Sequence, residues 1–167
     1  MVARERFAQG LTLQQYIDHM SINRERFVEA LEDVAIRPDE AKILDRFPGT
    51  RRVLVISEDW CGTCLAHVPF VAKLVESRAD IDMRLFPRDA NLDLMDQYLK
   101  KGRYRSIPVF AFFDENMNEV ARLIERPARI TEVIDKKMLE VRRGLRAENL
   151  EPWRQEIVTE IRNLLKA

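Results

Sequence analysis

Apolar residues in the first fifty positions recur at helical spacing. Thr12 and Gln15 have the spacing of a capping box, and Pro38 suits the first turn of a short third helix. The apolar positions that define the three expected helices are Leu13, Tyr16, Ile17 and Met20, then Phe27, Val28, Leu31 and Val34, then Ala41 and Leu44. No flexible linker follows Pro48-Gly49. We therefore interpret residues 1–50 as a helical N-terminal extension of one following domain.

The pattern changes after residue 50. The run Val53–Ile56 is short and wholly apolar, which is typical of a strand buried on both faces. A helical pattern follows the segment 59–64, and a second strand and a second helix come next, with Asn91 as the expected helix cap and Gly102 as its end. The apolar positions behind these elements are Leu65, Val68, Val71, Leu74 and Val75, then Ile81, Met83 and Leu85, then Leu94, Met95, Tyr98 and Leu99.

The remaining sequence predicts a hairpin and two helices. Ile107–Phe113 is the strongest strand signal, and Val120–Ile124 returns after a polar turn. Pro127 and Pro152 can each open a helix. Their apolar positions are Ile130, Val133, Ile134, Met138 and Val141, then Trp153, Ile157, Ile161, Leu164 and Leu165. From Val53 the order is β-α-β-α-β-β-α-α, so the first two strands should be parallel and the last two antiparallel. We predict an α/β domain over residues 51–167, a mixed central sheet flanked by helices.

The composition of the chain argues against several classes of function. The chain has 167 residues, 46% of them apolar, and its 28 basic and 28 acidic residues cancel. Nucleic-acid binding normally needs a basic excess, so we expect none. Residues 1–10 lack the apolar core of a secretory signal, and no apolar run reaches the roughly 18 residues that a membrane span needs. We therefore expect a cytoplasmic protein with no membrane contact.

The candidate reactive residues are Cys61 and Cys64, the two cysteines of the chain. A bridge between them would close a tiny loop and restrain little of the unfolded chain, so stability explains the pair poorly. Paired cytoplasmic cysteines are usually redox-active or metal-bound. Cys61 falls where a buried strand meets a helix, and a helix N-terminus favours the attacking thiolate. Cys64 lies one turn further on and is expected to resolve the mixed disulfide.

The segment Trp60-Cys61-Gly62-Thr63-Cys64 resembles the active-site motif of thioredoxin-like proteins. Pro69 and Ile107-Pro108 match the helix-kinking proline and the cis-proline of that family. The similarity covers roughly residues 51–142 and looks closest to a bacterial thioredoxin branch with a helical N-terminal extension. It implies disulfide oxidoreductase chemistry without a cofactor beyond the Cys61–Cys64 disulfide. The residues expected to contact substrate are Trp60, Gly62, Thr63, Ile107 and Pro108.

Two positions depart from the family pattern. Thr63 stands where thioredoxins usually have proline, which is expected to make the redox poise less reducing. Val55 stands where thioredoxins carry a buried aspartate that helps to move a proton from the resolving thiol. Glu58, Asp59, His67 or water are the candidates to take over that task.

The sequence leaves three functional hypotheses. The first is a reductase of protein disulfides, which needs an electron donor such as a reductase or a small thiol. The second is a redox-sensing module that docks a partner through the helical extension. The third is a metal or iron–sulfur protein, since Cys61, Cys64 and His67 are plausible ligands, with His19 as the other histidine. The segment Arg88-Asp89 reads as a surface loop or a substrate contact, and the oligomeric state stays open.

Overall fold

The computed structural model describes residues 2–46, 50–148 and 159. The chain divides into two compact units, residues 1–126 and residues 127–167. The boundary that the sequence suggested after residue 50 lies inside the first unit. The second unit contains α7 (Ala128–Glu148), the helix expected after Pro127. The helix expected after Pro152, with Trp153, lies outside the described residues.

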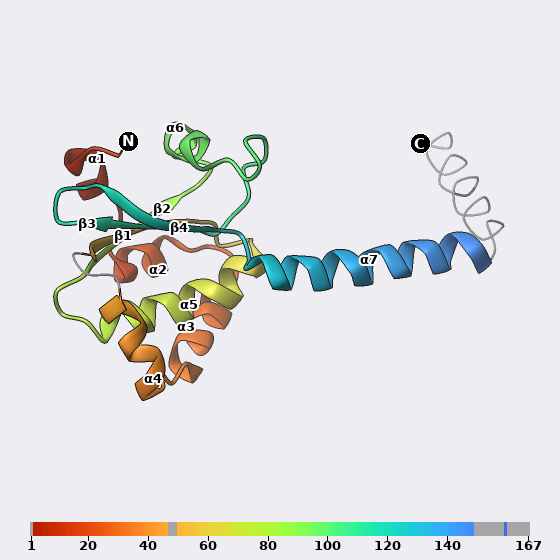
Figure 1. Ribbon diagram of the computed structural model, residues 1–167, viewed down its shortest axis with the longest axis horizontal. Helices are drawn as coiled ribbons and strands as arrows, with labels where there is room; N and C mark the ends of the chain where they lie inside the picture. The colour runs from red at the N-terminus through yellow and green to blue at the C-terminus, as the bar shows by residue number, and fades with distance from the viewer. Residues whose placement is uncertain (1, 47–49, 149–158, 160–167) are drawn as a thin grey trace. The chain divides into compact units, whose positions relative to one another are not determined.

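A four-stranded mixed sheet forms the centre of the first unit (Figure 1). Its strands are β1 (Thr50–Ser57), β2 (Asp82–Pro87), β3 (Val109–Asp114) and β4 (Glu119–Ile124), in the spatial order β2-β1-β3-β4. As predicted, β1 and β2 are parallel, while β3 and β4 form an antiparallel hairpin. The side chains of Val53–Ile56 are fully buried, because β1 lies inside the sheet and is covered on both faces.

Helices cover both faces of this sheet (Figure 1). The short helices α1 (Arg4–Ala8) and α6 (Leu92–Met95) lie on one face, and α5 (Gly62–Glu76) lies on the other with α3 (Arg24–Asp33) packed against it. This arrangement confirms the predicted α/β fold class. None of the helices in the described part of the chain is long and apolar enough to cross a lipid bilayer.

The N-terminal extension shares its hydrophobic core with the sheet. The capping box at Thr12 is present and begins α2 (Leu13–His19). Apolar side chains of the extension join the buried cluster that holds the strands, namely Val2, Phe7, Tyr16, Met20, Phe27, Leu31 and Leu44. The helices therefore fold onto the sheet as part of one core.

The chain also pairs with the outer strand just before α2. The backbone groups of Leu11 and Leu85 exchange two hydrogen bonds of 2.8 Å. Gly10 allows this close approach, because a Cβ atom there would lie 2.6 Å from Arg84 Cβ and from the ring of Phe86. The extension is thereby fixed to the edge of β2.

Several helix predictions need correction. Helix α1 was missed, because its five residues are too few to show a period. Helix α3 stops at Asp33, so Val34 is its C-cap. Helix α4 (Pro38–Ala41) has a single turn, and Leu44 belongs to a following 3-10 helix, η1 (Lys42–Arg46).

The helix predicted from Asn91 to Gly102 is also wrong in extent. Helix α6 gives way to a 3-10 turn, η2 (Asp96–Tyr98), so the helix ends well before Gly102. Gly102 has a φ of 66° in the turn that joins Lys100 to Tyr104. The Asn91 side chain does not cap α6, because its amide donates to the Pro87 carbonyl at 2.7 Å and its oxygen accepts from Arg6 at 2.8 Å.

Candidate functional site

Three chain segments meet at one end of the sheet. Strand β1 runs out at Ser57, which pairs with Pro87 at the end of the parallel strand β2. Strand β3 runs the other way, so its first residue, Val109, pairs with Ile56. The residues just outside these strands therefore gather at the same edge. They are the loop before Cys61, the segment Arg88-Asp89 and the dipeptide Ile107-Pro108.

Cys61 is the N-cap residue of α5. Its sulfur accepts a hydrogen bond from the backbone N–H of Cys64 at 3.3 Å, so the thiol occupies the place of a capping oxygen. The pKa of Cys61 is lowered to about 6. The main cause is the hydrogen bond from the Cys64 thiol, followed by the N–H groups of Cys64 and Thr63 and the positive charge of Arg88, while partial burial opposes them. The half-buried Cys61 is thus a thiolate near neutral pH.

Cys64 is the buried member of the pair, with 1% of its surface exposed. Burial raises the pKa of its thiol far above the ordinary value, and the interaction with Cys61 raises it further. Both sulfurs are free thiols in this structure. One accessible, charged sulfur and one covered, protonated sulfur give the two cysteines different chemical properties.

The dipeptide Ile107-Pro108 faces the thiol pair. The Ile107 carbonyl oxygen lies 3.9 Å from Cys61 Sγ, which is within the range of a weak thiol hydrogen bond. The peptide bond between Ile107 and Pro108 is cis, and the Pro108 carbonyl accepts from the Glu125 N–H at 2.7 Å. The structure therefore brings together two segments that are more than forty residues apart in the sequence.

The other residues expected to contact substrate surround Cys61. Trp60 is 45% exposed beside it. Gly62 is exposed, and a Cβ atom there would meet nothing within 4 Å. Thr63 is half-buried and contributes its N–H to the Cys61 sulfur. These residues leave an accessible surface around a single reactive sulfur.

Arg88 is a site residue that sequence reasoning left undecided. Its guanidinium lies 4.7 Å from the centre of the Trp60 ring, a cation–π distance. It forms an ion pair with Asp89 at 2.7 Å, and its charge helps to lower the pKa of Cys61. No local pattern indicates this role, because Arg88 is brought near Cys61 only by the parallel pairing of β1 and β2.

Ser57 and Tyr16 were missed as site residues. The Tyr16 hydroxyl, from α2, donates to Ser57 Oγ at 2.9 Å, and Ser57 is fully buried. The Ser57 side chain in turn lowers the pKa of the Cys64 thiol, against the effect of burial. Tyr16 was predicted only as an apolar helix position, and Ser57 was not predicted as part of any element. A polar residue directly after the apolar run Val53–Ile56 was the available signal.

The candidates for the missing buried acid are engaged elsewhere. Asp59 accepts from the N–H groups of Ser21 and Ile22, each at 2.8 Å, and these bonds outweigh burial and lower its pKa. The Glu58 carboxylate accepts from the Asp89 N–H at 2.7 Å, while burial raises its pKa. The Nδ1 atom of His67 lies 3.2 Å from the Glu125 carbonyl. Among the described residues, no three His, Cys, Asp or Glu side chains gather as a metal site requires.

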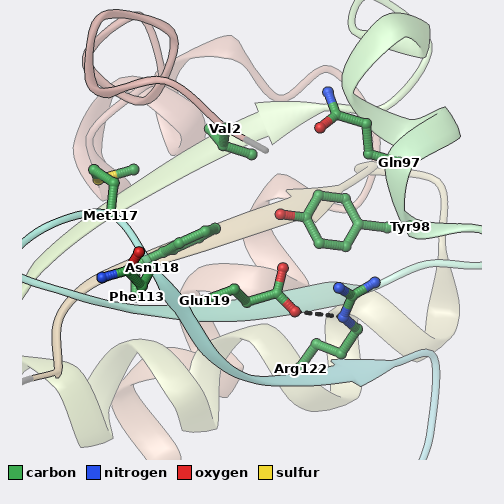
Figure 2. A pocket seen from close by; sticks show the side chains of 8 residues that line it. All are labelled: Val2, Gln97, Tyr98, Phe113, Met117, Asn118, Glu119 and Arg122. Carbon is green, nitrogen blue, oxygen red and sulfur yellow. Dashed lines mark hydrogen bonds and ion pairs between the residues drawn. The ribbon is translucent and has the colours of Figure 1, made fainter.

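A hollow lies apart from the thiols (Figure 2). Its volume is about 400 Å³, and it contains none of the site residues named above. Tyr98 lines it, as buried as Tyr16 at 2% exposure, and burial raises its pKa. The other lining residues are Val2, Gln97, Phe113, Met117, Asn118, Glu119 and Arg122. Tyr98 is therefore a buried hydroxyl outside the thiol site.

The lowered pKa leads to a first prediction. In the reduced protein, we expect alkylation of Cys61 by iodoacetamide to rise with pH around a midpoint of about 6, well below the roughly 8.5 of an ordinary thiol, since only the thiolate reacts. Mass spectrometry of the labelled peptide measures this rate. Cys64→Ala should raise the midpoint most and Arg88→Met by less, because this is the order of their contributions.

Arg84→Met is the matched control for this titration. Arg84 pairs with Asp82 at 3.0 Å and is not among the main causes that shift the pKa of Cys61, so the midpoint of this variant should equal that of the wild type. A wild-type midpoint near 8.5 would contradict the described capping geometry.

Comparison with known proteins supports a common fold. A family model described as thioredoxin matches residues 10–143. A protein of unknown function from Pseudomonas aeruginosa is similar in structure, with a TM-score of 0.69 and 18% identity over 86% of this chain and 89% of that one. An HIV epitope scaffold has a TM-score of 0.66 and 21% identity, over 78% and 81% of the two chains. No curated protein matches the sequence.

Proposed function

This chain belongs to the thioredoxin family, and from that premise we propose that it is a thiol–disulfide oxidoreductase that reduces protein disulfides. The observation that supports the proposal most is the asymmetry of the thiol pair. Cys61 caps a helix as a half-buried thiolate, while Cys64 is buried directly behind it. An attacking and a resolving thiol need these two environments.

The proposed cycle transfers two electrons to the substrate. The Cys61 thiolate attacks one sulfur of a substrate disulfide, forms a mixed disulfide and expels the other substrate sulfur as a thiolate. Cys64 then loses its proton and attacks Cys61 Sγ, which forms the Cys61–Cys64 disulfide and releases the second substrate thiol. The substrate is reduced by two electrons, and the pair is oxidised by two.

The surface around Cys61 suits an extended peptide. The exposed Trp60 ring offers an apolar face, and the backbone at Ile107 lies beside the attacking sulfur, where main-chain hydrogen bonds can orient a substrate. Gly62, which has open space around it, and Thr63 leave room for a peptide beside Cys61. An electron donor, either a reductase or a small thiol, would return the pair to the dithiol form, and we propose the reducing cytoplasm as the compartment.

Insulin reduction with dithiothreitol tests the proposal. The wild type should accelerate the reaction over dithiothreitol alone and turn over many times. Cys64→Ser should retain attack but lose resolution, so it should accumulate a 1:1 mixed disulfide between Cys61 and an insulin cysteine, detected by mass spectrometry.

The control is the double variant of Cys61→Ser and Cys64→Ser, which should trap nothing. If the wild type gives no acceleration, the proposed activity is wrong. A stable stoichiometric complex without turnover would instead favour the redox-sensing module.

A further inference from the structure

We propose that the buried hydroxyls of Ser57 and Tyr16, here called the hydroxyl pair, stabilise the Cys64 thiolate as it attacks the mixed disulfide. The helical N-terminal extension would then supply a positioning residue to the redox site. This inference rests on the proposed function, since it concerns the second step of that cycle. The hydroxyl pair would take over the task of the buried acid that the family carries and that Val55 replaces in this chain.

The hydroxyl pair forms a hydrogen bond in the buried core. Tyr16 donates to Ser57 Oγ at 2.9 Å in a site closed to solvent. A serine hydroxyl has one hydrogen, and this bond leaves it free to donate to a second partner. The Ser57 hydroxyl lowers the pKa of Cys64, which is the effect of a donor on that sulfur. We therefore assign the pair as two donors in series that end at the resolving thiol.

Electrostatics in the site agree with this direction. Burial raises the pKa of Tyr16, so the phenol stays protonated and remains a donor. The nearby carboxylates of Glu58 and Asp59 act in the same sense. Burial raises the pKa of Cys64, whereas the Ser57 hydroxyl and the backbone at Glu58 lower it. The hydroxyl pair therefore offsets part of the desolvation that opposes a Cys64 thiolate.

The chemical step balances without another reactant. Cys64 gives up its proton, its sulfur bonds to Cys61 Sγ, and the bond between Cys61 and the substrate sulfur breaks. The departing substrate thiolate takes up one proton in net terms. A donor aimed at Cys64 strengthens as charge develops on that sulfur, so it lowers the barrier to resolution. Attack by Cys61, the earlier step, needs no charge on Cys64.

A two-phase reaction separates the two steps. One equivalent of the chromogenic disulfide dithiobis(nitrobenzoate), mixed with the reduced protein, should release one coloured thiolate when Cys61 attacks and a second when Cys64 resolves. We expect Ser57→Ala to slow the second phase about tenfold and Tyr16→Phe about threefold, the range of a hydrogen bond to a charged group and of an indirect one. The first phase should stay within about twofold in both.

The pH profile distinguishes this role from a structural one. The profile of the second phase in Ser57→Ala should move toward higher pH by about one unit, since tenfold in rate corresponds to one unit of thiol ionisation. A variant carrying both Ser57→Ala and Tyr16→Phe should be no slower than Ser57→Ala alone, because Tyr16 acts through Ser57. Thermal unfolding of each variant checks that it is folded.

Tyr98→Phe is the matched control, because it removes an equally buried hydroxyl, one that lines the hollow away from the thiols (Figure 2). Both phases should remain at the wild-type rate. If both substitutions in the hydroxyl pair leave the second phase unchanged, the inference is wrong. Absence of the first phase in the wild type would instead refute the proposed function. If Ser57→Ala does not fold, Tyr16→Phe alone decides, because it retains the ring and removes a single oxygen.

Discussion

Replacing Cys61 with serine is expected to reduce insulin turnover to the rate of dithiothreitol alone. In the proposed cycle the attacking group is the Cys61 thiolate, held at the N-terminus of α5 with a pKa of about 6. A serine hydroxyl has no accessible anion in this pH range and does not form disulfides, so the first step is lost. No other thiol is placed to take over, since Cys64 is buried and protonated.

The comparison with Cys64→Ser makes this prediction specific. That variant should lose turnover and still form the mixed disulfide, whereas Cys61→Ser should lose both. Ser77→Ala, at the far end of α5, is the control and should retain the wild-type rate. Wild-type turnover by Cys61→Ser would mean that Cys61 is not the nucleophile.

Replacing Phe27 with alanine is expected to lower the free energy of unfolding by about 3–5 kcal/mol, the usual loss for a buried phenylalanine. Phe27 lies in the extension at 2% exposure, and its ring packs against Tyr16 with centroids 5.9 Å apart and planes at 59°. The lost side chain would leave a cavity in the core that the extension shares with the sheet. Urea unfolding measures the change.

The probe for this experiment is the fluorescence of Trp60 in a Trp153→Phe background, which reports on the thiol site. Because the extension and the sheet share one core, Phe27→Ala should lower the urea concentration at which the Trp60 fluorescence changes. Ile22→Ala, at an exposed position of the same extension, should stay within about 0.5 kcal/mol. A Trp60 transition unmoved by Phe27→Ala would show that the extension folds independently.

The sequence determined the order of elements from β1 onward. The runs Val53–Ile56 and Ile107–Phe113 are apolar enough to require a buried sheet, and the hairpin and the parallel pair follow from the connections between strands. The thiol pair could also be predicted, because its position between a buried strand and a helix is a local property of the chain. The extents of the helices at Asn91 and Pro38 could not be predicted, since segments of one turn carry no measurable period.

What only the tertiary structure decided is the environment of the thiols. Tyr16 and Ser57 are hydrogen-bonded although they are 41 residues apart in the sequence. Asp59 and Ser21 are hydrogen-bonded across a similar separation of 38 residues. No spacing rule predicts such contacts, because they depend on how the extension packs against the sheet rather than on local periodicity. Arg88 reaches the site through strand pairing for the same reason. The sequence thus determined which sulfurs are the candidates for reaction, and the packing of distant segments decided what surrounds them.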